Sequence, residues 1–194
     1  ASHSTSSAQP SAAAALVCPA GQITAEGSSA QSNAIQDVIA SYNDACKNKA
    51  KIEYNPTGSG AGIKNFNAGL VDFAGSDSAL KTDEATAAAA RCKTNAAWNL
   101  PMVVGPIAFS YNLKGVDKLI LNADTLAKIF QGKITTWNDP AIDALNAGVT
   151  LPADKIVVFY RSDESGTTEN VSKYLKATAP TVWTADASKA WKGV

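Results

Sequence analysis

Three short runs in the sequence combine glycine with small hydroxyl side chains where an extended pattern gives way to a helical one. The runs are Gly27-Ser28-Ser29, Thr57-Gly58-Ser59-Gly60-Ala61-Gly62 and Glu164-Ser165-Gly166-Thr167-Thr168. The first amides of a helix lack intrahelical partners and carry partial positive charge, so an oxyanion can bind them without a lysine nearby. Ser and Gly are also favoured as ordinary helix caps. Three such helix starts directed at one point would form an anion site.

Two further segments place charged side chains at the ends of predicted strands. These are Val71-Asp72-Phe73-Ala74-Gly75-Ser76-Asp77 and Val157-Val158-Phe159-Tyr160-Arg161-Ser162-Asp163. Three other motifs are Trp98-Asn99-Leu100-Pro101, Tyr111-Asn112-Leu113 and Ile129-Phe130-Gln131-Gly132-Lys133-Ile134-Thr135-Thr136-Trp137. In this order, from about Ile23 to Trp183, the set resembles the periplasmic phosphate-binding proteins of Pst-type ABC transporters.

The hydrophobic pattern predicts an alternation of strands and helices in the first part of the chain. Strands are expected at residues 22–26, 51–54 and 71–74, and helices at 32–49, 62–67 and 84–92. Such an alternation predicts a parallel sheet with crossover helices. The resemblance implies an α/β fold of the type II periplasmic-binding-protein kind, with two lobes of mixed sheets and helices. Ligand would then bind between the lobes, at the carboxyl ends of strands.

We expect three regions along the chain. Residues 1–20, rich in Ser and Ala, read as a disordered tether, 21–98 as the first lobe, and 99–194 as a crossover and an incomplete second lobe. The later region is expected to hold a strand over 98–113 that is interrupted by Pro and Gly, helices at 124–130, 140–145 and 167–176, and a strand at 156–160. Because the resembled family is about twice as long, we expect the C-terminal part to be missing, the alternative being a naturally short protein.

The resemblance also implies which residues bind phosphate. The expected contacts are made by Ser29, Ala30, Ser59, Asp77, Arg161, Ser165, Gly166 and Thr167. Arg161 would supply the formal positive charge, held and partly neutralised by Asp163 two residues later. Asp77 can only accept hydrogen bonds, so it would admit a protonated phosphate and reject sulfate, which carries no proton. As an alternative, Asp77 could simply cap the segment that follows it.

Composition excludes some classes of partner. With 17 basic and 17 acidic side chains the chain has no net charge, so nothing favours nucleic acid. No apolar stretch reaches the roughly 20 residues that span a bilayer. The resemblance implies an exported protein at the cell surface or in the periplasm, a monomer that delivers phosphate to an ABC permease. An export signal is expected to have been removed, and a membrane anchor would be a lipid on a cysteine outside this chain.

The three cysteines allow one internal disulfide and leave one thiol over. Cys46 and Cys92 each end a predicted helix of the first lobe, so we expect them to be paired and Cys18 to be unpaired. Metal ligation is not expected, because the sequence has no CxxC and its only histidine is His3, in the tether. No cofactor is expected either.

Enzyme activity is the alternative from another class. Ser165 could be read as a nucleophile, but a Ser-His-Asp arrangement needs an imidazole, and neither a Ser-x-x-Lys near these runs nor a P-loop is present. A weak phosphatase on the same fold stays open. So does a site for another tetrahedral oxyanion, such as arsenate, sulfate or molybdate, and arsenate matches phosphate in shape and protonation. No repeat or heptad favours a structural or adhesive protein.

Overall fold

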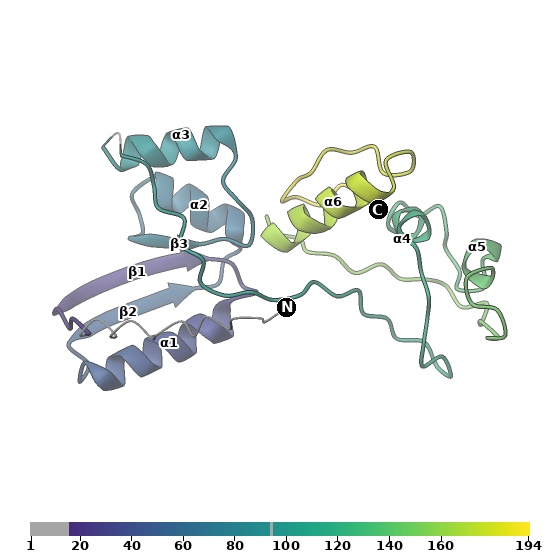
Figure 1. Cartoon of the computed structure of the whole chain (residues 1–194), viewed down its shortest axis with the longest axis horizontal. Coiled ribbons are helices and arrows are strands. Elements are labelled where there is room, and N and C mark those ends of the chain that lie inside the picture. The colour runs from purple at the N-terminus through teal and green to yellow at the C-terminus, as the bar shows by residue number, and fades with distance from the viewer. Residues whose placement is uncertain (1–15, 94) are drawn as a thin grey trace, which may run out of the picture.

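The structure is a computed structural model that describes residues 16–93 and 95–194. Most of the predicted tether, residues 1–15 with His3, lies outside the described residues. The described chain divides visibly into an N-terminal half built on a sheet and a C-terminal half built on helices and loops, joined by a long extended segment (Figure 1).

Three parallel strands form the sheet of the N-terminal half. They are β1 (Gly21–Gly27), β2 (Ala50–Asn55) and β3 (Phe73–Gly75), in the order β2-β1-β3. Residue 23 pairs with 52 and residue 25 with 73, so β1 is central. The predicted parallel βαβαβ arrangement is confirmed. All three strands end at one edge, where the loops that carry the predicted site residues begin.

Helices α1 (Ser32–Ala45) and α2 (Ser59–Asn67) cover opposite faces of this sheet (Figure 1). Strand β2 lies on one side of β1 and β3 lies on the other, so the two crossovers run in opposite directions across the sheet. Because both crossovers are right-handed, their helices α1 and α2 lie on opposite faces of the sheet. Ile35 and Ile39, one turn apart on α1, pack against Ala25 and Tyr54 of the strands. Helix α3 (Thr82–Arg91) lies outside α2 and buries Ala88.

Glycines let α2 approach the sheet at the edge where the site forms. A Cβ added at Gly62 would lie 2.5 Å from the Cα of Gly27, and one at Gly27 would lie 2.1 Å from the carbonyl oxygen of Gly75. Gly27 also has a φ of +143°, which side chains rarely adopt. These three positions therefore hold β1, β3 and α2 in direct backbone contact.

The C-terminal half contains helices α4 (Ala123–Phe130), α5 (Pro140–Asp143) and α6 (Gly166–Thr178). Asn122 caps α4 by accepting the Thr125 amide, and Asp139 caps α5 immediately before Pro140. The three helices agree with the predicted ones within a few residues. Two apolar clusters hold this half together: one includes Val116, Ile129, Ile134, Ile142 and Leu151, and the other includes Leu126, Ala127, Leu175, Ala179 and Trp183.

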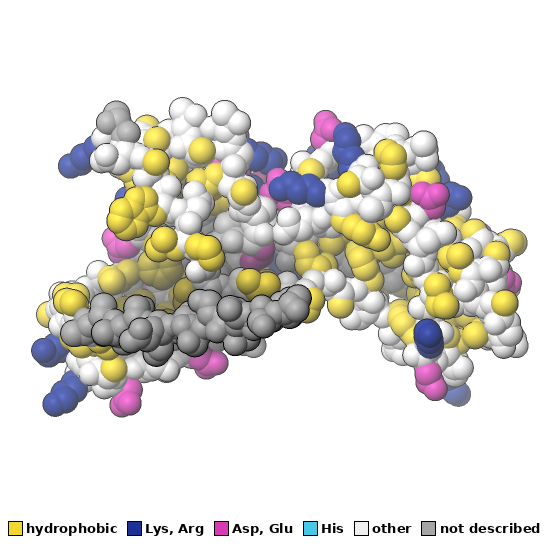
Figure 2. Space-filling model, viewed as in Figure 1, with side chains coloured by type: hydrophobic (Ala, Val, Ile, Leu, Met, Phe, Trp, Pro, Cys, Tyr) yellow, Lys and Arg dark blue, Asp and Glu magenta, His cyan; other side chains and the backbone are white. Residues whose placement is uncertain are grey.

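Two predicted strands in the C-terminal half are wrong. Residues 98–113 and 156–160 form no strand, and the only pairing nearby among the described residues is the isolated bridge between Thr136 and Lys155. Val104 is 96% exposed and Phe159 is 88% exposed, although their sequence is apolar. Apolar side chains are accordingly visible on the surface of this half (Figure 2). A strand needs a neighbour for its backbone hydrogen bonds, and no described segment provides one here.

The predicted disulfide between Cys46 and Cys92 is also wrong. Cys18 pairs with Cys46, and Cys92 is a free thiol. Residues 16–18 run back along α1, where the Tyr42 hydroxyl donates to the carbonyl of Val17 at 3.2 Å. Cys92 follows α3, on the side of the sheet opposite α1, so it is on the wrong face to meet Cys46 (Figure 1). The segment from residue 16 to 20 is thus attached to the fold and does not belong to a free tether.

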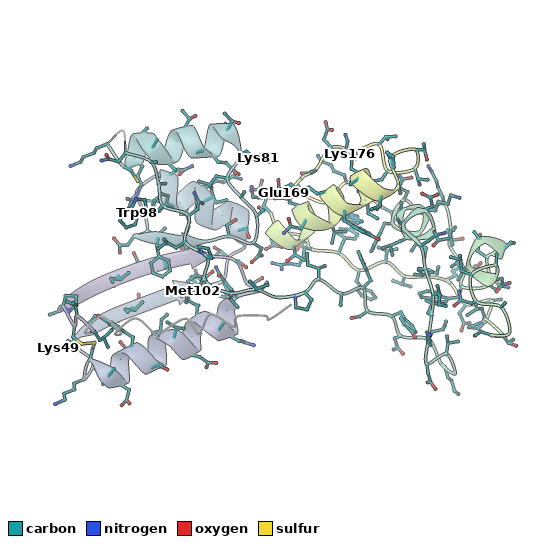
Figure 3. The ribbon with its side chains drawn as sticks, in the orientation of Figure 1. Lys49, Lys81, Trp98, Met102, Glu169 and Lys176 are labelled. Atoms are coloured by element: carbon teal, nitrogen blue, oxygen red, sulfur yellow. A yellow bond between two sulfur atoms is a disulfide. The ribbon has the colours of Figure 1, made fainter. Side chains whose placement is uncertain are left out.

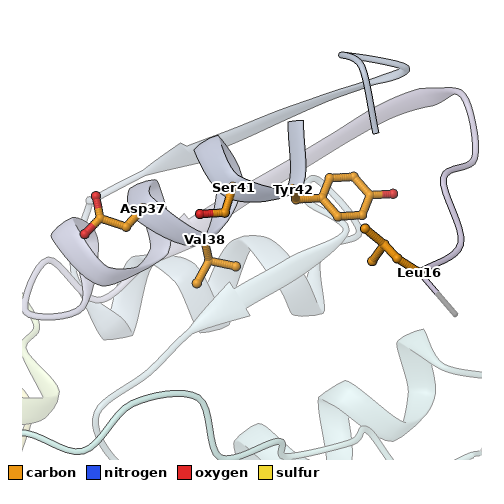
Figure 4. A pocket seen from close by; sticks show the side chains of 5 residues that line it. All are labelled: Leu16, Asp37, Val38, Ser41 and Tyr42. Atoms are coloured by element: carbon orange, nitrogen blue, oxygen red, sulfur yellow. The ribbon is translucent and has the colours of Figure 1, made fainter. Parts of the chain in front are cut away.

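A surface hollow lies beside this attached segment. Leu16, Val38 and Tyr42 line it, together with Asp37 and Ser41 of α1 (Figure 4). Its walls are mainly apolar, and its α1 residues lie in the middle of that helix. No helix of the described residues is long and apolar enough to cross a membrane.

Candidate anion-binding site

Asp77 lies where the three predicted helix starts meet. It follows β3 by two residues, and its carboxylate accepts hydrogen bonds from the hydroxyls of Ser28 and Ser59, the latter at 3.3 Å. Its backbone amide donates to the Ser59 hydroxyl at 3.2 Å, and its carbonyl accepts from the side chain of Asn170 on α6 at 2.8 Å. One aspartate therefore contacts the first, second and third of the predicted segments.

Ser28 is a site residue that the sequence interpretation missed. Its side chain is 1% exposed, and its hydroxyl donates to Asp77 while accepting the Ala30 amide at 3.1 Å. Tyr54 donates to the carbonyl of Ser28 at 2.7 Å, and burial raises the pKa of this phenol, which keeps it a donor. The Gly-Ser-Ser run contains the signal, but the resemblance implies a contact from its second serine, Ser29. Helix α1 begins at Ser32, as expected, after a turn through Ala30 and Gln31.

The second helix start, that of α2, is packed against the C-terminal half. Ser59 is the first residue of α2 and is 1% exposed, and the amide of Gly60 donates to the carbonyl of Glu164 at 2.9 Å. Gly58, with a φ of +99°, lies so close to Asp163 that an added Cβ would be 2.4 Å from its carboxylate. The loop before α6 is therefore packed directly on the start of α2.

The third helix start offers two backbone donors. Ser165 caps α6: its hydroxyl accepts the Thr168 amide at 3.4 Å, and its own amide donates to the carbonyl of Lys189 at 3.0 Å. The amides of Gly166 and Thr167, the first two residues of α6, make no hydrogen bond to any described residue. The Ser165 amide is thus occupied, whereas the next two amides point out of the helix start and are available to an anion.

Arg161 and Asp163 form the ion pair that the sequence predicted. The guanidinium binds the carboxylate through two nitrogens, at 2.7 and 2.5 Å. Arg161 and Thr167 also line a hollow of about 160 Å³ whose other walls include Phe109, Phe130 and Trp191. The one positive side chain among the predicted site residues is therefore partly neutralised and stands at the rim of an apolar hollow.

The predicted residues are thus brought together to different degrees. Ser59, Asp77 and Gly166 touch, because a Cβ added at Gly166 would lie 2.9 Å from both the Asp77 Cβ and the Ser59 hydroxyl oxygen. Ser29 and Thr167 are half-buried, and their hydroxyls make no hydrogen bond to any described residue. Ala30 is exposed, and its amide is already bound to the Ser28 hydroxyl.

The chemistry available at this place is hydrogen bonding. Backbone amides and hydroxyls surround one carboxylate acceptor, and the nearest arginine is already paired. Among residues 16–93 and 95–194, no group of three or more His, Cys, Asp or Glu side chains is placed to hold a metal ion. Such a site suits a small oxyanion that can both accept and donate hydrogen bonds.

A parallel α/β half joined to a second half, with helix starts meeting between them, is the architecture of a solute-binding protein. The model of the PBP superfamily domain matches residues 8–194. The chain belongs to this superfamily, and the resemblance that the motifs indicated is confirmed.

Relatives of known name agree with this assignment. The chain is 50% identical over 171 residues to phosphate-binding protein PstS 3 of Mycobacterium tuberculosis, and 45% identical over 174 residues to phosphate-binding protein PstS2 of Mycobacterium bovis. The alignments cover 88% and 89% of this chain but 46% of each relative. The chain thus spans about half the length of the curated relatives it matches.

A solved structure supports the fold. The chain matches a putative phosphate ABC transporter substrate-binding protein with bound phosphate from Clostridium perfringens, with a TM-score of 0.57 and 19% identity. The match covers 86% of this chain and 67% of that structure. At this identity the likeness concerns the fold alone.

Proposed function

We propose that this chain belongs to an extracytoplasmic solute-binding protein that captures inorganic phosphate between its two halves and delivers it to an ABC permease. The observation that carries the proposal is the position of Asp77, a hydrogen-bond acceptor among three helix starts that otherwise offer donors. The names of the two relatives reported above, which are phosphate-binding proteins, support the same ligand.

Phosphate matches this set of donors and acceptors. Its oxygens can accept from the amides of Gly166 and Thr167 and from the hydroxyls of Ser29 and Thr167. At neutral pH it carries at least one proton, which Asp77 can accept. Sulfate offers no proton to this carboxylate, so the two negative groups would face each other without a hydrogen bond between them. Arsenate is protonated in the same way and is the alternative ligand.

We propose that the protein is not an enzyme. The Ser165 hydroxyl, the one candidate nucleophile, is 1% exposed and accepts the Thr168 amide, so it is used as a helix cap. No histidine occurs within the described residues to act as its base. A weak phosphatase is the alternative, and a chromogenic phosphate ester tests it: release of the chromophore that is lost in Ser165→Ala would favour the enzyme.

The same proposal includes the protein's place in the cell. An exported protein, acting as a monomer and attached to the membrane only by a lipid outside this chain, accords with the disulfide between Cys18 and Cys46, since disulfides persist in oxidising compartments. Cell fractionation, together with mass spectrometry of the N-terminal peptide of the natural polypeptide, tests this part.

Titration calorimetry tests the ligand. Phosphate, arsenate and sulfate are titrated into the 194-residue chain and into the complete polypeptide that contains it. We expect phosphate and arsenate to bind and sulfate not to bind. A folded polypeptide that binds none of them, or binds sulfate as tightly as phosphate, would contradict the proposal.

A further inference from the structure

A group of three charged side chains, two of them buried, lies at the junction of the two halves. Lys189 is 5% exposed and Glu169 on α6 is 2% exposed. The Lys189 ammonium lies 2.8 and 3.1 Å from the two carboxylate oxygens of Glu84, the third residue of α3, and 3.3 Å from Glu169. A single lysine thus stands between carboxylates from two helices.

This lysine ties the two halves of the molecule together. Glu84 belongs to the N-terminal half, and Lys189 follows it by 105 residues. Figure 3 shows Lys81, at the start of α3, and Glu169, in α6, on the two sides of the junction. A second ion pair across the junction, Lys64 with Glu164 at 2.7 Å, is exposed and therefore more strongly screened. The Lys189 pair is the buried one of the two.

Lys189 compensates the charge on one of the two carboxylate oxygens of Glu169. One of its oxygens is buried, receives no hydrogen bond from a described residue, and faces the Lys189 ammonium. The other oxygen lies 3.4 Å from Lys173, one turn further along α6. A carboxylate buried in this way is strongly disfavoured when its partner is removed.

The backbone of Lys189 holds the anion site directly. Its carbonyl accepts the amide of Ser165, the residue that caps α6 and precedes the two free amides of Gly166 and Thr167. One residue therefore fixes the start of α6 with its backbone and draws α6 toward α3 with its side chain. If Lys189 moved, the Gly166 and Thr167 amides at the start of α6 would move away from Asp77.

We propose that Lys189 is a positioning residue for the anion site, which holds the start of α6 against the N-terminal half through Glu84 and Glu169. This inference rests on the proposed phosphate-binding function. Lys189 itself does not touch the ligand, because its ammonium is enclosed by the two carboxylates.

Calorimetry with inorganic phosphate on the complete polypeptide tests this role. Lys189→Met keeps the length of the side chain and removes its charge, and we expect phosphate to bind at least about 10-fold more weakly with unchanged stoichiometry. Lys176→Met is the matched control. Lys176 lies on α6 and also pairs with a carboxylate, Asp186, but this pair is exposed and lies away from the site, so the affinity should equal that of the parent.

A second variant covers the case in which Lys189→Met does not fold. Glu84→Gln removes the charge opposite Lys189 but keeps an oxygen that can accept the Lys81 amide, as the glutamate does at 2.8 Å. We expect it to weaken phosphate binding several-fold, and the double variant to bind no more weakly than Lys189→Met alone, since both changes break one contact.

The outcomes separate the two proposals. An unchanged phosphate affinity in Glu84→Gln, or in folded Lys189→Met, would overturn the positioning role and leave phosphate binding intact. A lower stoichiometry at parental affinity would also overturn it, because that result shows only partial unfolding. A folded parent that binds no phosphate would overturn the proposed function and this inference with it.

Discussion

The backbone of Gly166 packs directly against Asp77, so that a Cβ added at residue 166 would lie 2.9 Å from the Asp77 Cβ and 3.0 Å from its amide nitrogen. Gly166 begins a helix of the C-terminal half, and Asp77 follows the last strand of the N-terminal half. A glycine at this place lets the third helix start reach the carboxylate around which the other two are arranged.

Replacement of Gly166 by alanine should therefore open the site. The added methyl group would meet Asp77 and Ser59 at distances that Cβ atoms do not tolerate, so α6 must shift away. We expect phosphate affinity to fall at least about 10-fold, or about 1.4 kcal/mol, in calorimetry. Gly105→Ala is the control, because nothing lies within 4 Å of a Cβ added there. Equal affinities in the two variants would show that this contact does not matter for binding.

Asp77→Asn should weaken the discrimination against sulfate. The amide oxygen can still accept a hydrogen bond, whereas the amide nitrogen can donate to an unprotonated anion. The change also leaves one of the Ser28 and Ser59 hydroxyls without a carboxylate acceptor, which should cost about 1 kcal/mol of stability.

Competition calorimetry, with sulfate titrated in the presence and absence of phosphate, measures the discrimination. Asp186→Asn serves as control, since its carboxylate is exposed and pairs with Lys176. If Asp77→Asn rejects sulfate as strongly as the parent does, the carboxylate is not the selective group.

The helices and parallel strands of the N-terminal half were predictable because their patterns are local. Ile35 and Ile39 lie one turn apart, and both are buried against the sheet as that spacing indicates. Residues 156–160 have an equally apolar pattern but form no strand. A strand depends on a partner for its hydrogen bonds, and such a partner cannot be inferred from the segment itself.

Individual residues of the candidate site were predictable from the sequence, but the contacts that hold distant segments together were not. The motifs located Ser59, Asp77 and Gly166, which the fold brings into contact. The pairing of Cys18 with Cys46 depends on a segment that runs back along α1, and the contact between Lys189 and Glu84 joins residues 105 positions apart. Neither relation leaves a periodic or local signal in the sequence.

The disulfide predicts a difference in stability between cysteine variants. Cys46 is 2% exposed and closes a loop with a sequence separation of 28, for which the chain-entropy estimate is about 3–4 kcal/mol. Cys46→Ser should therefore lower the melting temperature markedly, while Cys92→Ser should change it little. Peptide mapping without reductant should recover Cys18 joined to Cys46, and a maleimide should label Cys92. A peptide that joins Cys92 to either other cysteine would contradict the assignment.

The buried ion group predicts a characteristic dependence of stability on pH. For Glu169, burial raises the pKa, but the nearby Ser78 hydroxyl with Lys189 and Lys173 outweighs it, so the pKa lies below its ordinary value of 4.5. For Lys189, burial lowers the pKa, but Glu84 and Glu169 outweigh it, so the pKa lies above 10.5. Glu169 therefore contributes stability that is lost as pH falls through its lowered pKa, and Lys189 contributes stability that is lost as pH rises through its raised pKa.

Denaturant unfolding of the parent and of Lys189→Met across this range measures the contribution. We expect the parent to be more stable by about 3 kcal/mol between about pH 5 and pH 10, as for a broken buried pair, and the difference to shrink at both ends. Lys176→Met provides the comparison, with a small difference at all pH values because its pair is exposed. A constant difference across the whole range would mean that the charge of Lys189 is not responsible.

The pairing of Arg161 with Asp163 predicts that phosphate binding depends little on salt. Because this guanidinium is already partly neutralised, most of the binding energy should come from short hydrogen bonds at Ser29, Gly166 and Thr167, which a closed site shields from ions. Attraction by unpaired surface charge would weaken beyond a Debye length of about 8 Å at physiological ionic strength. Phosphate affinity should thus stay nearly constant in calorimetry as sodium chloride is raised.

In Asp163→Asn the arginine loses its partner, so binding should become stronger at low salt and clearly salt-dependent. A steep loss of affinity with salt in the parent, together with normal binding in Ser59→Ala, would show that surface charge and not the helix starts holds the ligand.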